Sequence, residues 1–337
     1  MTIRAGKALE GFIPSRITKE GHWLSPSLPI RASVQHKHRC VAEAGISATQ
    51  QPFERNDVDP QNRITVLSWG CGVQSTTLAV MSALGDLPPL DAVITSDTMF
   101  ESTETYQIRD WYKRWLKERG VRVEIVTGGD IRALGAQEHI HIPFWTSDGG
   151  PLQRQCTYEF KIMPVRRRVR ELMGYDPSKP PHPPPNSVEQ WLGISLDEHI
   201  RATRLESRVR FITTTFPLLS KEMSRGDCQR YFKEHDLPVP PKSACLCCPY
   251  RRASEWLRIK QEAPQDWQAA IEFDEANRHN PLAARGGSTA DELFIWRNRH
   301  KEPESLKDAD MEAEAEYERQ SVYFQPPLIC ESGYCWA

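Results

Sequence analysis

The order of apolar and polar segments along the chain predicts an α/β fold. Short apolar runs alternate with longer stretches whose apolar residues recur at helical spacing. The strands are expected at 64–68, 91–96, 121–126, 188–194 and 209–215, and the first two helices at 74–84 and 102–119. Strand, helix and strand in this order are typical of a parallel sheet with right-handed crossovers. The pattern therefore predicts a doubly wound parallel sheet, followed by a mostly helical C-terminal part.

The rest of the chain divides into four segments. Residues 1–62 carry no sustained strand or helix period and are expected to form a flexible leader before an α/β domain at 63–220. A loop is expected at 176–185, where six of the ten residues are proline. A helical, cysteine-rich part at 221–300 and an acidic helix with a cysteine-containing tail at 301–337 follow. Helices are expected at 226–235, 254–262, 265–278 and 291–299, the first of them after the candidate N-cap Ser224.

Composition narrows the class of protein. The 337 residues include 43 Lys and Arg against 45 Asp and Glu, which leaves a formal net charge of −2. This balance excludes a generally basic nucleic-acid coat, although it allows a local basic groove. No run reaches the roughly 18 apolar residues that span a bilayer, and the N-terminus has no apolar export signal. Nine cysteines in such a chain indicate metal or thiol chemistry rather than disulfides. We therefore expect a cytoplasmic protein without a membrane partner.

A glycine-containing turn follows the first predicted strand and opens the first predicted helix. It runs Ser68-Trp-Gly-Cys-Gly-Val-Gln-Ser-Thr76, at the edge of a parallel sheet where ligands bind. Gly70 and Gly72 allow the backbone to approach an anion closely. The hydroxyls of Ser68, Ser75 and Thr76 add donors, and so does the helix N-terminus. An ordinary strand-to-helix turn, which uses glycine for its backbone angles, explains the same residues equally well.

Five segments in order resemble the adenine-nucleotide α-hydrolase (PP-loop) superfamily, and most closely its phosphoadenosine-phosphosulfate reductase-like branch. The turn resembles the pyrophosphate-binding Ser-Gly-Gly-x-Asp-Ser loop of that superfamily. The other segments are Thr95-Ser-Asp-Thr-Met-Phe-Glu, Arg154-Gln-Cys-Thr-Tyr-Glu-Phe-Lys, Trp191-Leu-Gly-Ile-Ser-Leu-Asp-Glu and Phe216-Pro-Leu. The resemblance as a whole covers roughly residues 64–300. The resemblance implies a nucleotide-binding, PP-loop ATPase-like domain at 63–220.

The same resemblance implies which residues bind the nucleotide. They are Ser68, Gly70, Gly72, Gln74, Ser75, Thr76, Asp97, Arg154, Lys161, Gly193 and Arg201. The expected ligand is ATP or (phospho)adenylyl sulfate, with Mg²⁺ as a further cofactor. Gln74 departs from the family pattern, because many of these loops carry Asp there and an amide cannot supply a carboxylate to Mg²⁺. The departure weakens the case for ATP-pyrophosphatase chemistry, whereas nucleotide binding survives it.

The cysteine-rich segment at 243–250 is a candidate metal centre. It contains the Cys-x-x-Cys pair Cys245 and Cys248, whose spacing lets two thiolates hold one metal or cluster. Cys156 and Cys228 offer two further thiolates, and Cys247 is an adjacent spare. In the resembled family, the equivalents of Cys156 and of the pair hold an iron–sulfur cluster beside the nucleotide. We therefore favour a [4Fe–4S] cluster on the four cysteines, with structural zinc and plain buried thiols as alternatives.

The C-terminal tail contains Cys330 and Cys335. Reductases of the resembled branch end in a mobile tail with a nucleophilic cysteine. The resemblance thus implies that one of these two is a catalytic nucleophile or resolving partner, served by a thiol reductant protein. An incidental pair of exposed cysteines is an equally good interpretation.

Basic residues gather between Arg154 and Arg170 and again between Arg201 and Arg210. If both groups border the glycine-containing turn, they would bind phosphate or sulfate oxygens through bidentate contacts. A phosphate track for a nucleic-acid substrate is the other option.

Three functions are compatible with these features. The first is ATP-dependent sulfur transfer to nucleic acid, as in tRNA thiolation or DNA phosphorothioation, with a sulfur donor as a further partner. The second is reduction of adenylyl sulfate or its 3′-phosphate with release of sulfite, which Gln74 and the tail cysteines favour. The third is a non-catalytic nucleotide- or redox-sensing module. The four cysteines and the basic stretches favour sulfur transfer, and we adopt it as the leading hypothesis.

Overall fold

The structure is a computed structural model. It describes residues 63–134, 136, 142–148, 150–203, 205, 207, 209–281 and 290–321. All of these belong to one compact unit, residues 55–337. The predicted leader at 1–62 lies outside the described residues, and so does the tail with Cys330 and Cys335. Along the described part of the chain, no helix is long and apolar enough to cross a membrane.

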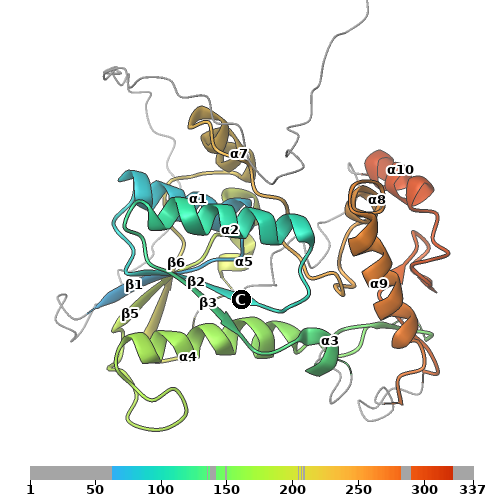
Figure 1. Cartoon of the computed structure of the whole chain (residues 1–337), viewed down its shortest axis with the longest axis horizontal. Helices are drawn as coiled ribbons and strands as arrows, with labels where there is room; N and C mark the ends of the chain where they lie inside the picture. The colour runs from blue at the N-terminus through green and yellow to red at the C-terminus, as the bar shows by residue number, and fades with distance from the viewer. Residues whose placement is uncertain are drawn as a thin grey trace, which may run out of the picture. The chain divides into compact units, whose positions relative to one another are not determined.

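The centre of the unit is a five-stranded parallel sheet, which confirms the predicted fold class (Figure 1). The strands are β1 (Ile64–Ser68), β2 (Ala92–Asp97), β3 (Val123–Thr127), β5 (Val188–Trp191) and β6 (Ile212–Thr215). Their order across the sheet is β3-β2-β1-β5-β6. The chain moves outward from β1 in one direction and then returns to the other side of β1. This reversal places a switch point beside β1, at whose carboxyl end ligands bind in open α/β sheets.

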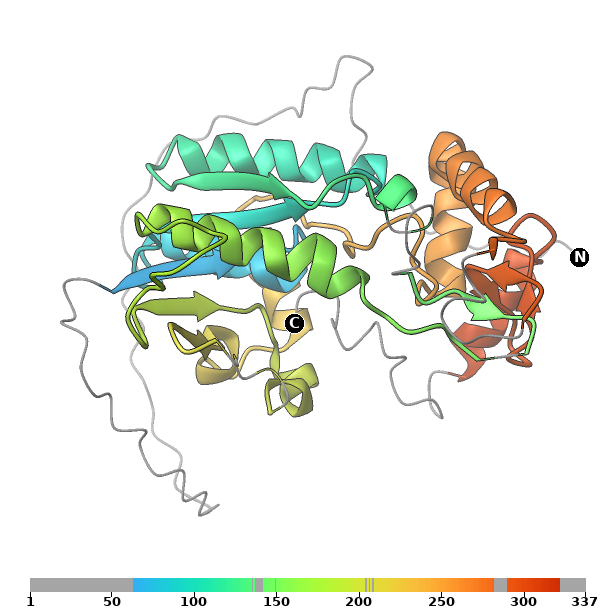
Figure 2. The same cartoon turned by 90° about the horizontal axis from the view of Figure 1, so that it is seen from below.

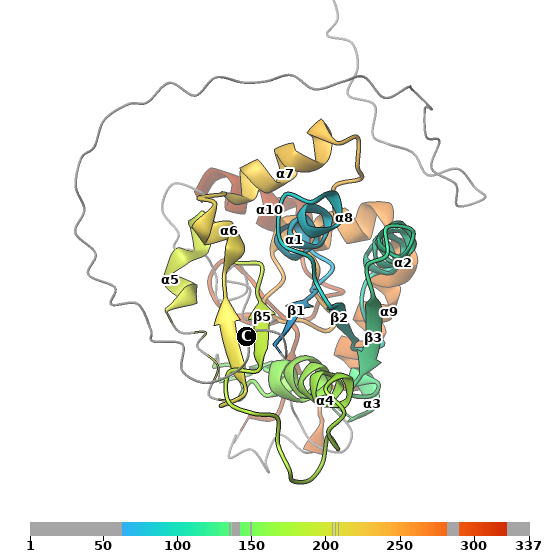
Figure 3. The same ribbon diagram turned by 90° about the vertical axis from the view of Figure 1, so that its left-hand side faces the viewer.

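Helices cover both faces of the sheet (Figure 3). One face carries α1 (Val73–Leu84), α2 (Thr103–Lys117) and α7 (Arg225–Glu234), and the other carries α4 (Met163–Leu172). The strand residues divide accordingly, because successive side chains point to opposite faces. Leu67 and Val93 belong to the apolar core under α1, whereas Val66 and Ile94 belong to the core over α4.

A third apolar core lies among the helices α8 (Ala253–Glu262), α9 (Pro264–Ala276) and α10 (Met311–Ser321). Figure 2 shows these orange and red helices gathered beside one edge of the sheet. Asp266 at the start of α9 ties them to the sheet domain, since its carboxylate accepts hydrogen bonds from the backbone N–H and the hydroxyl of Thr103, at 2.8 and 2.7 Å. The Cys245 segment and the core around Trp256 therefore face the region that follows β2.

The prediction of a helix at 291–299 is wrong. The structure has two short strands there, β7 (Leu293–Phe294) and β8 (Trp296–Arg297). They pair with β4 (Trp145–Thr146) and β9 (Pro303–Glu304), which are distant or short segments without a strand pattern of their own. Ile295 between them is fully buried and donates its backbone N–H to Asp274 at 2.8 Å. The acidic helix also begins later than predicted, at Met311, because β9 takes up part of the segment before it.

Other local predictions are confirmed. Ser224 caps α7 in a capping box with Asp227, whose backbone N–H donates to the Ser224 hydroxyl at 3.1 Å. The proline-rich segment at 176–185 contains no helix or strand. The remaining short elements are α3 (Ile131–Ala133), a π-helical turn (Tyr158–Ile162), a 3₁₀ turn (Leu196–Glu198), α5 (His199–Ala202) and α6 (Pro217–Ser220).

Candidate functional site

The turn between β1 and α1 is held from inside by its own side chains. The backbone N–H of Gly70 donates to the Ser75 hydroxyl at 3.1 Å, and the indole N–H of Trp69 donates to Thr76 Oγ1 at 2.9 Å. The predicted ligand hydroxyls of Ser75 and Thr76 are thus engaged in fixing the turn. Ser68 is similarly occupied, because its hydroxyl accepts a hydrogen bond from the Gln190 amide at 2.5 Å.

The start of α1 has the features of an anion site. Gly72 is the N-cap, no side chain caps the helix, and no acidic residue lies in its first turn. Val73, Gln74 and Ser75 are all buried. The first N–H groups of a helix have no partner within the helix, and they give this end a partial positive charge. The arrangement can therefore bind a phosphate group through backbone donors.

Gly193 lies against this first turn, as the sequence predicts for a residue of the site. A Cβ on Gly193 would lie 2.6 Å from the backbone nitrogen of Ser75. Real Cβ atoms do not approach backbone so closely, so only glycine allows the loop after β5 to pack here. The segment after β5 and the turn after β1 thus form one surface.

A polar network joins Gln74 to two arginines beside the turn. The Gln74 carbonyl oxygen accepts from Arg225 Nη1 at 2.9 Å, and its amide donates to Glu198 Oε2 at 3.3 Å. Arg201 pairs with the same Glu198 oxygen at 2.7 Å. Burial raises the pKa of Glu198, while the two arginines act against that rise. The structure therefore brings Arg201 to the turn, and it adds Arg225, which no motif in the sequence indicated.

Asp97 and Arg154 occupy different places. Asp97 ends β2 and is paired with Arg109 at 2.7 Å, and its other oxygen accepts from the hydroxyl of Tyr106 at 3.0 Å. Arg154 donates to the Thr157 hydroxyl at 2.6 Å and lies over the ring of Tyr250, 5.6 Å from its centre. Arg154 is thus placed near the cysteine-rich segment, whereas Asp97 lies at the carboxyl edge of the sheet.

The cysteine-rich segment is attached to that same edge. Cys245 forms a single antiparallel β-bridge with Glu101, and the N–H of Leu246 donates to the carbonyl of Phe100 at 2.8 Å. The Cys245 thiol lies 3.3 Å from both Glu101 Oε1 and Thr98 Oγ1. Lys161, which is also buried, pairs with the same glutamate oxygen at 3.3 Å. Lys161 therefore belongs to the cysteine side of the site.

Two further cysteines lie close to Cys245. The Cys247 pKa is raised well above its ordinary value by a hydrogen bond with Cys245, by burial, and by the charges of Cys245, Cys156 and Glu101. A tight turn closes the Cys-x-x-Cys pair, because the N–H of Cys248 donates to the carbonyl of Cys245 at 3.1 Å. The structure thus gathers the thiols of Cys156, Cys245 and Cys247 and holds Cys248 on the same turn.

Cys228, the fourth predicted ligand, is not gathered with them. It lies on α7 in the core between α7 and α1, where it is fully buried and hydrogen-bonded to Thr77. Burial raises its pKa to about 11. Its place follows from the amphipathic α7 helix, which buries the face that carries Cys228 and Phe232.

Cys71 lies in the turn between β1 and α1 and is buried. It has a left-handed backbone with φ of 57°. Its thiol lies inside, 3.5 Å from the hydroxyl of Thr95, and burial raises its pKa to about 12.

The donor set on the cysteine side suits a thiolate-bound centre in its chemistry. Within the described residues, however, no three His, Cys, Asp or Glu side chains are arranged to hold a metal ion. The thiols of Cys156, Cys245 and Cys247 interact without converging on one point. No step of the proposed reaction is therefore assigned to a metal or cluster.

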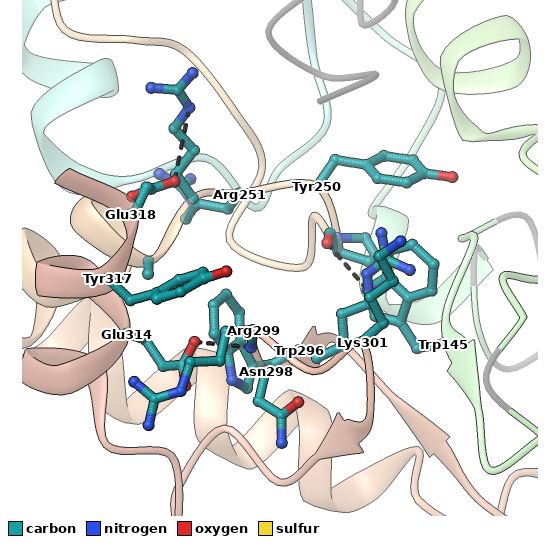
Figure 4. A pocket seen from close by; sticks show the side chains of 14 residues that line it. Trp145, Tyr250, Arg251, Trp296, Asn298, Arg299, Lys301, Glu314, Tyr317 and Glu318 are labelled. Atoms are coloured by element: carbon teal, nitrogen blue, oxygen red, sulfur yellow. Dashed lines mark hydrogen bonds and ion pairs between the residues drawn. The ribbon is translucent and has the colours of Figure 1, made fainter. Parts of the chain in front are cut away.

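A small pocket of about 160 Å³ lies behind the cysteine turn (Figure 4). Figure 4 shows Tyr317 on one side of this pocket and Trp145 on the other. Arg251 is buried and donates to the carbonyls of Ala244 and Cys245, at 2.5 and 3.2 Å. Trp145 donates its indole N–H to the carbonyl of Pro249 at 3.1 Å. The pocket walls therefore fix the backbone of the cysteine turn.

The comparisons with known proteins find weak likenesses among solved structures alone. No family model matches the chain, and no curated protein matches it. Among solved structures, the phosphoadenylyl-sulfate (PAPS) reductase from Candida auris, in a phosphate complex, is similar over 53% of this chain and 75% of that chain. The sequence identity is 13% and the TM-score is 0.34. The α/β class of this chain therefore rests on its own strand order and helices.

Proposed function

We propose that this protein is an enzyme of sulfur chemistry that binds an adenine nucleotide at the Ser68–Thr76 turn and transfers sulfur to nucleic acid. One observation carries the proposal: the nucleotide turn and the cysteine segment lie on the same edge of the sheet. Cys245 is within 3.3 Å of Thr98 and Glu101, which follow β2 directly. β2 is the neighbour of β1, which leads into the turn.

The phosphates of the nucleotide are bound by the backbone N–H groups at the start of α1, where Gly72 leaves room for them. Arg201 and Arg225 lie beside this helix end and add positive charge, although Glu198 and Gln74 share their guanidinium groups. Positive charge fixed at this place stabilises the charge that develops on departing pyrophosphate. The nucleotide would activate an acceptor by adenylation, with release of pyrophosphate.

The cysteine side carries the sulfur chemistry. The thiols that would hold an iron–sulfur cluster are those of Cys156, Cys245, Cys247 and Cys248. Cys247 replaces Cys228 of the set predicted from the sequence, because Cys228 lies in the core between α7 and α1. Lys161 pairs with Glu101, which contacts the Cys245 thiol, and Arg251 donates to the Cys245 carbonyl, so both bring positive charge to this segment. Glu101 orients Cys245 through the contact with its thiol.

The reductase remains the second candidate, because Gln74 gives the turn no carboxylate for Mg²⁺. Its side chain is committed to Arg225 and Glu198. The test is turnover of the full chain, purified without oxygen. Pyrophosphate formed from ATP in the presence of a nucleic-acid acceptor supports the proposed activity. Sulfite formed from a phosphosulfate supports the reductase instead, and nucleotide binding without either product contradicts both enzymatic functions.

A further inference from the structure

A second cavity lies on the α4 face of the sheet. It has a volume of about 570 Å³. Its lining comes from α4, from the proline-rich segment before β5, and from the residues before β6: Tyr158, Met163, Arg166, Arg167, Arg170, Pro177, His182, Pro183, Pro185, Val209, Arg210 and Phe211. Figure 3 shows α4 on the face opposite α1. The cavity is therefore separate from the nucleotide turn.

The charges around this cavity are all positive. Arg166, Arg167 and Arg170 come from α4, and Arg210 comes from the segment before β6. Among its described lining residues there is no carboxylate, and no described carboxylate forms an ion pair with any of the four arginines. Arg168 of the same helix differs, because it pairs with Glu124 and Glu171. Three arginines of α4 thus line the cavity, whereas Arg168, which is paired with carboxylates, does not.

Two of these arginines are poorly solvated. Arg170 is 8% exposed, and it donates to the carbonyls of Lys179 and Pro181 at 2.6 and 3.3 Å. Its Nε is buried without a partner. Burial lowers the pKa of Arg166, and only Tyr158 acts against this shift. A buried or half-buried cation without a carboxylate partner is costly, and an anionic ligand would offset the cost at Arg170 and Arg166.

The lining of the cavity indicates a ligand that has apolar surface as well as negative charge. Met163, Pro183 and Phe211 supply apolar surface. Tyr158 is 46% exposed, and its ring centre lies 5.9 Å from the Arg166 guanidinium. A cationic groove with an accessible aromatic ring is the combination that binds single-stranded nucleic acid, with phosphates on the arginines and a base stacked on the ring.

We propose that this cavity binds a single-stranded segment of nucleic acid through Arg166, Arg167, Arg170 and Arg210, with a base against Tyr158. The inference rests on the proposed function, since it gives the nucleic-acid acceptor a docking place on the chain. Three arginines of the first basic cluster and Arg210 of the second line this cavity, on the opposite side of the sheet from α1, whereas Arg201 lies at the turn.

The test is fluorescence anisotropy of labelled 20-nucleotide single strands, as DNA and as RNA, with the full chain at several salt concentrations. We expect binding of at least one of the two strands by the wild type. Arg166→Ala and Arg210→Ala should each weaken it about tenfold and make the slope of log K against log salt shallower by about 0.7. Arg114→Ala, which removes an exposed charge from α2 on the other face, is the matched control.

Unchanged binding in both cavity variants would overturn the inference, as would an equal loss in Arg114→Ala. Absence of single-strand binding by the wild type, or binding of inorganic phosphate alone, would overturn it too. If Arg166→Ala unfolds, Arg167→Glu on the exposed side of α4 replaces it. Titration with ATP separates the two proposals. Loss of strand binding with intact ATP binding in the variants supports the cavity, whereas a wild type that binds strands but no nucleotide contradicts only the proposed function.

Discussion

Gly193 and Ser75 are in direct backbone contact, although 118 positions separate them (193 − 75). The space that a Cβ of Gly193 would fill is taken by the nitrogen and Cα of Ser75, at 2.6 and 2.8 Å. Backbone atoms of a helix start cannot move aside as a flexible side chain can. The contact therefore fixes the distance between the loop after β5 and the anion-binding end of α1.

Gly193→Ala should displace this helix end. We expect a loss of about 1–3 kcal/mol in the free energy of unfolding, as for an overpacked site, together with weaker nucleotide binding. Urea unfolding and calorimetric titration with ATP measure the two effects. Gly150→Ala is the control, because a Cβ there meets nothing within 4 Å. Equal stability of the two variants would show that the contact does not constrain the loop.

Glu101→Gln should destabilise the fold strongly. Glu101 and Lys161 are 8% and 5% exposed, and the substitution leaves the lysine charge buried without its carboxylate. Breaking such a pair costs about 3–5 kcal/mol. The exposed pair of Lys307 and Glu275 provides the comparison, since Glu275→Gln should cost less than about 1 kcal/mol. Similar unfolding free energies for the two variants would show that the buried pair of Glu101 and Lys161 does not stabilise the fold more than an exposed pair does.

Iron content distinguishes the two possible sets of cysteine ligands. After purification and reconstitution without oxygen, the wild type should be brown with about four irons per chain. Cys245→Ala should lose the iron, whereas Cys228→Ala should keep it, because Cys228 lies in the core between α7 and α1. A colourless, zinc-loaded wild type would rule out the cluster. Loss of iron in Cys228→Ala would restore the original ligand set.

Cys228 should also make the fold sensitive to alkali. Its pKa is raised from 9.0 to about 11 in the folded chain, so the native state keeps a proton that the unfolded state loses above about pH 9. This contribution is complete below pH 9 and is lost as the pH rises through 11. The free energy of unfolding should fall by up to about 1.4 kcal/mol per pH unit in this window from this group. Urea unfolding of Cys228→Ala should show a correspondingly shallower fall, and identical slopes would refute the shift.

The sheet could be predicted from the sequence because its determinants are local. Apolar runs mark the strands from Ile64 onward, and the candidate cap Ser224 marks a helix start that the structure reproduces. The strands β4 and β7 could not be predicted, since Trp145 and Phe294 pair across a long stretch of chain and neither segment carries a strand pattern. The composition of 291–299 is compatible with a helix, and only the pairing of β7 with the distant β4 makes this segment a strand.

The site was predictable where a motif named its residues. Gly193 and Arg201 lie beside the turn at Ser68–Thr76, and their role in binding a nucleotide stays a prediction. No motif in the sequence predicted that Arg225 lies at the turn or that Lys161 pairs with Glu101, because these side chains come from separate segments that meet only after folding. Cysteine spacing alone also could not show that Cys228 is buried in the core between α7 and α1, since its burial depends on which face of α7 packs against α1.

Titration of ATP into the wild type and into Gly72→Val tests nucleotide binding at the turn most directly. A Cβ at Gly72 would lie 3.8 Å from Ser243 and 3.9 Å from Pro241, so Gly72→Ala should fold like the wild type and is the control for the larger valine. The branched side chain of valine would press on these two residues at the start of α1, where the proposed phosphate contacts the backbone, and the thermal unfolding of Gly72→Val is recorded beside that of Gly72→Ala. We expect the wild type to bind ATP and the variant to bind it at least about tenfold more weakly, a difference of about 1.4 kcal/mol. Equal affinities of the two proteins for ATP and for adenosine phosphosulfates would show that the nucleotide does not bind at this turn.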